Sequence, residues 1–248
     1  PENPVLIHKV FNKGSKKIAY LMYNAFTADF DEALNNAFAD FKAQGATDLI
    51  LDLRYNGGGS VDSATYLASM ITGQFNGQVF AVEKWNSKLQ PFKGNERENF
   101  TSNMVKGSRQ VAINSLRLNK VYVITSDETA SASELVINGL KAYIDVVQVG
   151  ETTVGKNQGS VTVYDFTDKQ RKVKNPKHKW AMQPLVMKIE NAKGIGDYVN
   201  GLEPNIQISE IVNDLGVLGD ETEPLLARTL QEITGNVAGR ASRSASKE

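Results

Sequence analysis

The sequence contains no cysteine among its 248 residues and only two histidines. The absence of cysteine excludes thiol catalysis, thiolate metal sites and disulfide bonds, although it fits a reducing or an oxidising compartment equally well. Neither His8 nor His178 has a second histidine at metal-ligand spacing, and no Gly-x-Ser-x-Gly elbow is present. The sequence therefore predicts no metal site and no cofactor. A Ser-His arrangement stays open only if segments far apart in the sequence meet in space.

The sequence also lacks an excess of either charge, because 28 Lys and Arg residues balance 28 Asp and Glu residues. No overall field therefore attracts the protein to nucleic acid or to an anionic membrane. No apolar run approaches the roughly 18 residues that span a bilayer, so no integral membrane segment is expected. The sequence begins at Pro1 without an initiator methionine, which suggests a trimmed fragment. We expect any partner to be recognised locally.

Strand-like and helix-like segments alternate along the chain, which predicts an α/β layered fold. The expected strands are 17–23, 48–53, 79–85, 120–125, 145–149, 158–166 and 181–189. The expected helices are 30–41, 61–71, 131–140 and 223–233. Residues 86–115 are polar, charged and interrupted by glycine, so a long loop or an inserted flap is expected there. Residues 236–248 are rich in Ala, Ser and Arg and predict a disordered tail.

The first candidate for chemistry is Ser131, in the segment Thr129–Glu134 at the expected start of a helix. A serine at this place can simply cap the helix, with Glu134 completing a capping box. A nucleophile can use the same place, because free N–H groups and the positive helix end stabilise an oxyanion. Both interpretations stay open at this stage. Weaker candidates for the nucleophile are Ser126, Thr129 and Ser133.

The second candidate is Lys156, in a Gly-Lys turn just after an expected strand. The usual state of a lysine is a solvated surface side chain. A serine hydroxyl is a poor nucleophile unless a base takes its proton, and a lysine amine is a base only when its surroundings keep it uncharged. The hypothesis of a Ser-Lys hydrolase therefore requires the fold to bury Lys156 beside Ser131, with Glu151 pointing away.

The third candidate is the segment Asp52–Gly59, an expected strand that runs into three consecutive glycines. Glycines let backbone amides approach a ligand without an intervening Cβ, as an oxyanion hole requires. An ordinary tight turn between a strand and a helix explains the same pattern, and the two interpretations have equal support.

The segment Gly150–Lys156 also matches most of a phosphate-binding loop. The next residue is Asn157 instead of Ser or Thr, and the residues that follow predict a strand where a phosphate-binding loop requires a helix. Nucleotide binding is therefore disfavoured.

Taken together, these motifs resemble those of the carboxyl-terminal processing, or tail-specific, serine proteases. The family's Asp-Leu-Arg-x-Asn-x-Gly-Gly motif is matched within Asp52–Gly59, its Thr-Ala-Ser-Ala-Ser-Glu motif by Thr129–Glu134, and its Gly-Glu-x-Thr-x-Gly-Lys motif by Gly150–Lys156. The likeness extends over residues 17–233. The resemblance implies a fold related to the crotonase and ClpP class, built from β-β-α units, with a protease catalytic domain over residues 1–235.

The resemblance also implies roles for individual residues. In this family the first serine of the hexapeptide is the nucleophile and the lysine is the general base, which here are Ser131 and Lys156. The oxyanion would be held by the backbone N–H groups of Ala132 and of Gly58 or Gly59.

The sequence departs from the family pattern in two ways. Family members often orient the lysine with a glutamine four residues later, where this chain has Ser160, and Gln158 or Thr162 are the possible substitutes. The family also commonly carries a PDZ domain that captures substrate termini, for which this chain has no room. Such a domain is expected upstream of Pro1 or is absent.

The function implied by the resemblance is a serine endopeptidase that hydrolyses protein or peptide substrates, including their C-terminal ends, through an acyl-enzyme. The implied location is the bacterial periplasm, the cell envelope or the exterior. The alternative is a non-catalytic module on the same scaffold that binds a ligand or a peptide. Neither hypothesis involves nucleic acid or a cofactor.

Overall fold

The computed structural model describes residues 2–211 and 213–235, so the tail expected at 236–248 lies outside the described residues. Its main sheet has the strand order β1-β2-β3-β8-β9-β14. β1 and β2 form an antiparallel hairpin, and the other neighbouring strands are parallel. The strands are β1 (Val5–Lys13), β2 (Lys16–Tyr23), β3 (Asp48–Asp52), β8 (Lys120–Thr125), β9 (Asp145–Gly150) and β14 (Ile206–Gln207).

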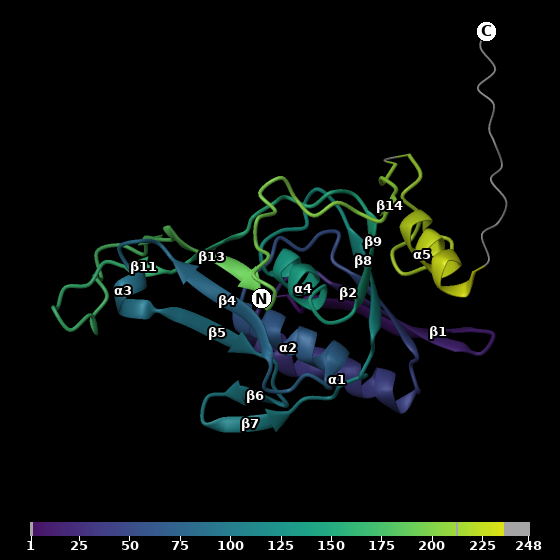
Figure 1. The fold of residues 1–248 in the computed structure, drawn as a ribbon, viewed down its shortest axis with the longest axis horizontal. Helices are drawn as coiled ribbons and strands as arrows, with labels where there is room; N and C mark the ends of the chain where they lie inside the picture. Colours follow the sequence, from purple (N-terminus) through teal and green to yellow (C-terminus); the bar gives the residue numbers. More distant parts are fainter. Residues whose placement is uncertain (1, 212, 236–248) are drawn as a thin grey trace, which may run out of the picture.

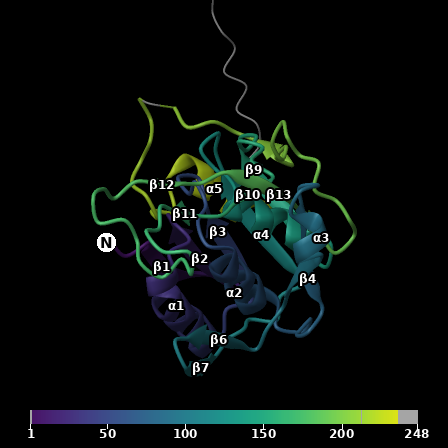
Figure 2. The same ribbon diagram turned by 90° about the vertical axis from the view of Figure 1, so that its left-hand side faces the viewer.

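Helices cover both faces of this sheet (Figures 1 and 2). One face packs against α1 (Asp31–Ala43), α2 (Val61–Thr72) and α4 (Ala132–Leu140), and the other against α5 (Pro224–Thr234). Successive residues of β3 alternate between the two cores, because Leu49 and Leu51 belong to the first and Ile50 to the second. A parallel sheet that is covered on both faces needs strands that are apolar throughout. Hence five of the six residues of β8 are buried.

A second sheet, antiparallel throughout, has the strand order β10-β13-β4-β5. Its strands are β4 (Val79–Trp85), β5 (Asn95–Asn99), β10 (Gln158–Ser160) and β13 (Leu185–Asn191). Two small hairpins complete the fold, and β4 is followed by the short helix α3 (Gln90–Lys93). The hairpins are β6 (Asn103–Lys106) with β7 (Arg109–Ala112), and β11 (Val163–Tyr164) with β12 (Ala181–Met182).

The α/β architecture expected from the sequence is confirmed, as are the expected helices and the strands at 17–23, 48–53, 79–85, 120–125 and 145–149. The two expected β-segments at 158–166 and 181–189 are each divided into two strands. β1 was not expected, because His8 and Lys9 interrupt its apolar alternation. In the described ranges no helix combines the length and the apolar character needed to cross a bilayer.

Of the two alternatives expected at 86–115, the long loop is wrong, since α3, β5, β6 and β7 all form there, and the inserted flap stays a prediction. β5 has the sequence Asn-Glu-Arg-Glu-Asn, without an apolar residue. It lies at the edge of the second sheet, where backbone pairing with β4 stabilises it and polar side chains are tolerated. The composition of β5 gives no sign of a strand, because the strand forms only through its pairing with β4.

Candidate active site

Ser131 is the residue that immediately precedes α4, and its backbone has φ +59° and ψ −112°. A positive φ is uncommon outside glycine, and such residues persist only where their surroundings fix them. The Ser131 N–H donates a hydrogen bond to Glu134 Oε2 at 2.8 Å. The carboxylate half of the expected capping box is therefore formed, and it holds the backbone of the candidate nucleophile.

Glu134 is fully buried, and both of its carboxylate oxygens accept hydrogen bonds. Oε2 also accepts from the N–H of Lys156 at 2.9 Å, while Oε1 accepts from Thr153 Oγ1 and from the N–H of Gly155, each at 2.6 Å. A buried carboxylate requires such donors because no water can solvate it. One carboxylate thus joins the segment of Ser131 to the segment of Lys156. The sequence indicated only that Glu134 caps α4. It did not indicate the contacts of Glu134 with the segment of Lys156, because that segment lies beyond the next strand, β9 (Asp145–Gly150).

Lys156 lines the same cavity as Ser131, and this cavity has a volume of about 320 Å³. The prediction that Lys156 is buried is wrong, since the residue is exposed. Its backbone is fixed by Glu134 and its neighbours Gly155 and Asn157 are buried, so only the side chain emerges toward solvent. Among residues 2–211 and 213–235 it has no ion-pair partner.

The glycine turn packs directly against Ser131. Gly58 has φ +104°, and a Cβ at this position would lie 2.7 Å from Ser131 Cβ and 2.8 Å from the carbonyl oxygen of Ala130. Both the dihedral angle and the distance require glycine. Gly58 is therefore the point at which the turn after β3 meets the start of α4.

The amides beside Ser131 differ in their availability. The Gly58 N–H donates to Asn56 Oδ1 at 2.9 Å. Within the described parts of the chain, the N–H groups of Gly59 and Ala132 donate no hydrogen bond, and both residues line the cavity together with Ser131. Of the donors implied by the resemblance, Ala132 and Gly59 therefore line the cavity, the Gly58 N–H is bonded to Asn56, and the oxyanion hole stays a prediction.

The three weaker candidates for the nucleophile are all buried and have structural hydrogen bonds. Ser126 Oγ donates to the carbonyl oxygen of Arg54, Thr129 Oγ1 to that of Leu53 at 2.9 Å, and Ser133 Oγ to that of Asn56 at 2.9 Å. These hydroxyls connect the segment before α4 to the turn after β3. They leave Ser131 as the serine that faces the cavity from this segment.

The structure places two of the three possible orienting residues in the cavity. Gln158 and Ser160, both in β10, line it together with Lys156. Thr162 is exposed and lies outside the cavity lining, where its Oγ1 accepts a hydrogen bond from Gln183 Nε2 at 3.3 Å.

A buried ionic network supports the glycine turn from the opposite side. Arg54 is fully buried and donates to Asp52, Glu210 and Glu223, with contacts of 2.8, 2.7 and 2.8 Å. Burial raises the pKa of Asp52. Burial also acts to raise the pKa of Glu223, but the hydrogen bonds and charge of Arg54 outweigh it and the pKa is lowered. The sequence showed Asp52 and Arg54 only as parts of a motif, because Glu210 and Glu223 are distant in the chain.

The rest of the cavity wall combines polar and apolar side chains. Its apolar part is formed by Val61, Leu135, Met187, Ile189 and Tyr198. Burial raises the pKa of Tyr198, and the nearby charge of Glu134 adds to the effect. Apolar side chains and convergent polar groups that line one cavity are typical of a ligand site.

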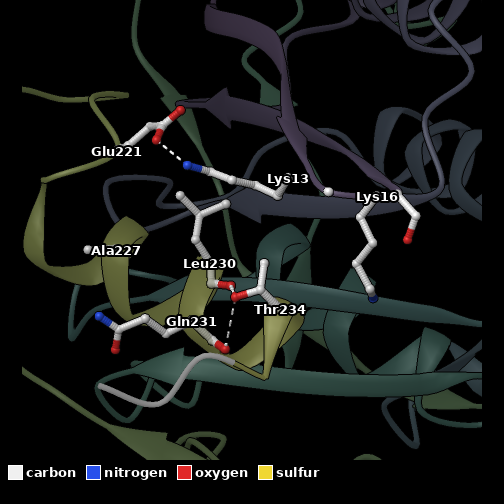
Figure 3. Close-up of a pocket in the computed structure, with 9 residues that line it drawn as sticks. Lys13, Lys16, Glu221, Ala227, Leu230, Gln231 and Thr234 are labelled. Atoms are coloured by element: carbon white, nitrogen blue, oxygen red, sulfur yellow. Dashed lines mark hydrogen bonds and ion pairs between the residues drawn. The ribbon is translucent and has the colours of Figure 1, made fainter. Parts of the chain in front are cut away.

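A second and larger cavity lies between the β1–β2 turn and α5 (Figure 3). It contains Ser15 and two lysines, which raises the question of a second Ser-Lys pair. Lys13 forms an ion pair with Glu221, as Figure 3 shows, and Lys16 forms one with Asp48 at 3.0 Å. Both amines are thus engaged by carboxylates, and this cavity supplies no uncommitted base.

The sequence model of Peptidase family S41 matches residues 17–208. The chain belongs to peptidase family S41. The resemblance to carboxyl-terminal processing proteases is thereby confirmed, and the S41 chain is similar to named members of that group. It is 28% identical over 195 residues to the "Probable CtpA-like serine protease" of Staphylococcus epidermidis, which covers 77% of this chain and 34% of the relative. It is 24% identical over 217 residues to the "C-terminal processing peptidase, chloroplastic" of Tetradesmus obliquus, which covers 85% of this chain and 40% of the relative.

Solved structures confirm the crotonase-like α/β fold of the S41 chain. An S41 protease candidate from Bacteroides fragilis superposes with a TM-score of 0.83 at 28% identity, over 95% of this chain and 59% of that one. The photosystem II D1 C-terminal processing protease superposes with a TM-score of 0.57 at 20% identity, over 88% of this chain and 47% of that one. The chain thus spans about a third to three fifths of the length of these relatives.

Proposed function

We propose that this S41 chain is a serine endopeptidase that cleaves protein substrates, within the chain or near the C-terminus, through an acyl-enzyme on Ser131. One observation carries the proposal: Ser131 and Lys156 face one cavity, and Glu134 Oε2 binds the backbone N–H groups of both. The substrate carbonyl would lie between Ser131 and the amides of Gly59 and Ala132. Donors that are fixed before the reaction stabilise the oxyanion without reorganisation.

The reaction follows from these positions. Ser131 Oγ attacks the scissile carbonyl carbon while the Lys156 amine accepts the hydroxyl proton, which Lys156 then donates to the leaving amine. A water molecule, deprotonated by Lys156, attacks the acyl-enzyme and releases the second product. Ser131 regains its proton, so the cycle closes without a cofactor.

The exposure of Lys156 places a condition on this mechanism. A general base must be uncharged at the working pH, and removal of water favours the neutral amine. A polypeptide that lies along the cavity would cover the exposed side chain of Lys156 and displace water from it. Substrate binding would therefore supply the dehydration that the fold alone does not provide.

The proposal is tested with single substitutions in the full chain. Ser131→Ala and Lys156→Ala should each abolish cleavage of an unfolded protein substrate, followed by mass spectrometry, while the far-UV circular dichroism stays that of the wild type. The matched controls are Ser87→Ala and Lys88→Ala, because both residues are exposed and lie outside the cavity lining. Retention of cleavage by either cavity variant would show that the roles are assigned wrongly.

A non-catalytic binding module is the second candidate, and the exposure of Lys156 is the observation that favours it. Such a module would bind peptides without cleaving them, and the wild-type cleavage assay separates the two candidates. A location in the bacterial periplasm, the cell envelope or the exterior is also part of the proposal. Fractionation of the source cells with an antibody against the chain tests it.

A further inference from the structure

Residues 161–182, called the basic arm here, connect two residues that line the cavity of Ser131. Ser160 precedes the arm, Gln183 follows it, and both belong to the cavity lining. The strands β11 and β12 pair at its base, Val163 with Met182 and Tyr164 with Ala181. In Figure 1 the arm extends past α3 and away from the main sheet. Both ends of the arm are therefore joined to the cavity of Ser131.

The arm concentrates positive charge in a protein that is neutral overall. Two acidic side chains oppose six basic ones, so its net charge is +4 with His178 neutral. The basic residues are Lys169, Arg171, Lys172, Lys174, Lys177 and Lys179. None of the six is ion-paired to a residue of the ranges 2–211 and 213–235.

The two acidic residues are engaged within the arm itself. Asp165 accepts a hydrogen bond from Asn175 Nδ2 at 2.7 Å and lies 3.2 Å from His178 Nε2. Asp168 Oδ1 accepts from the backbone N–H groups of Lys172 at 3.0 Å and Val173 at 2.7 Å. The acids shape the arm, and the basic side chains are left for an anionic partner.

The arm also exposes large apolar side chains. Trp180 is 83% exposed, Met182 68% and Val173 55%. A hollow of about 390 Å³ lies beside Trp180, and its lining includes Tyr164 and Lys174, whose Nζ is 3.5 Å from the centroid of the Tyr164 ring. Exposed tryptophan, tyrosine and methionine side chains are typical anchors of a protein interface, and the lysines around them supply charge complementarity.

We propose that the basic arm is a docking surface for an acidic segment of the polypeptide substrate, with an apolar side chain seated against Trp180. The inference rests on the proposed function and specifies its substrate class. Complementary charge speeds encounter and selects the partner. A segment held on the arm also raises the effective concentration of the adjoining residues at Ser131.

The test separates binding from cleavage by using the full chain with Ser131→Ala. A fluorescent peptide with a run of glutamates and one phenylalanine is compared by anisotropy with the same peptide carrying glutamine in place of glutamate. We expect the acidic peptide to bind about tenfold more tightly, with an advantage that falls as salt rises from low to physiological concentration. Equal affinity for the two peptides would overturn the proposal.

Arm variants locate the binding. Lys177→Gln/Lys179→Gln should weaken the acidic peptide about fivefold, and Trp180→Ser should weaken both peptides. Lys42→Gln/Lys193→Gln is the matched control, since both lysines are exposed and lie outside the arm and the cavity lining. An equal loss of affinity for the acidic peptide in Lys177→Gln/Lys179→Gln and in the control would overturn the proposal. Arm-dependent binding to anionic phospholipid vesicles, without binding of the acidic peptide, would also overturn it.

With Ser131 intact, Lys177→Gln/Lys179→Gln should hydrolyse a short neutral peptide at the wild-type rate and lose kcat/KM only on acidic protein substrates. Because the anisotropy measurement needs no catalysis, a failure of docking is distinguishable from a failure of the proposed peptidase activity. An unchanged kcat/KM of the arm variants on acidic protein substrates would count against the docking surface alone.

Discussion

A single oxygen atom, Glu134 Oε2, accepts hydrogen bonds from the backbone N–H groups of Ser131 at 2.8 Å and Lys156 at 2.9 Å. The two residues belong to different segments, one at the start of α4 and one between β9 and β10. Their spacing therefore depends on a carboxylate that is not itself part of the cavity lining. Glu134 acts as a positioning residue in the proposed reaction.

Replacement of Glu134 by glutamine tests this role. The amide offers one acceptor oxygen where four donors converge, so at least one segment should shift. A displacement of about 1 Å can cost about 100-fold in rate, and we expect kcat to fall by about 10–100-fold, with a smaller change in KM. Glu128→Gln is the control, because Glu128 is exposed and precedes the same helix. An unchanged kcat in a folded Glu134→Gln protein would contradict the positioning role.

Gly58→Ala tests the close approach of the glycine turn to Ser131. The added Cβ would lie 2.7 Å from Ser131 Cβ, and the φ of +104° is strained for alanine. We expect the free energy of unfolding to fall by about 2–4 kcal/mol, measured by denaturant titration. In the neighbouring control, Gly57→Ala, the new Cβ meets no atom within 4 Å, and a change below about 1 kcal/mol is expected. Similar losses in both variants would argue against the contact.

The regular elements of the main sheet could be predicted because their residues carry a local signal. β8 is apolar over most of its length, and α2 ends at Gly73, whose φ is +69°. β5 could not be predicted, since its strand exists only through pairing with β4. Local pattern thus predicts elements that bury their own apolar face, and it misses those that depend on a neighbour.

The candidate site likewise combines features that the local sequence predicts with features that depend on residues far away in the chain. The sequence predicts that Ser131 precedes a helix and that a glycine turn lies nearby, because capping and glycine chemistry are local. It does not predict the exposure of Lys156, which depends on how far the cavity is open on that side. Nor does it predict that Glu223 meets Arg54, because 169 residues separate them.

The buried network beneath the turn gives a third prediction. Arg54→Met leaves the carboxylates of Asp52 and Glu223 buried without their cation. Loss of one partner from a buried ion pair costs about 3–5 kcal/mol, and we expect that decrease in the free energy of unfolding. Arg228→Met removes the more exposed pair with Glu232 and should cost less than about 1 kcal/mol. Comparable losses in the two arginine variants would show that the network adds little.

The last prediction concerns Glu83, a buried residue of β4 that lies opposite Glu96 of β5. Burial raises the pKa of Glu83 to about 7, the charges of Glu98 and Glu96 add to the rise, and Lys93 opposes it. Between pH 4.5, near the value for an unfolded glutamate, and about 7, the folded state binds more protons than the unfolded state. The free energy of unfolding should therefore fall as pH rises through this window.

Glu83→Gln removes this titration while preserving the shape of the side chain. At pH 8 the variant should be more stable than the wild type by about 1–3 kcal/mol, whereas at pH 4 the two should agree. Denaturant titrations at several pH values measure the difference, with Glu203→Gln as an exposed control that should follow the wild type. A constant offset between Glu83→Gln and the wild type at every pH would mean that packing, and not the buried charge, separates them.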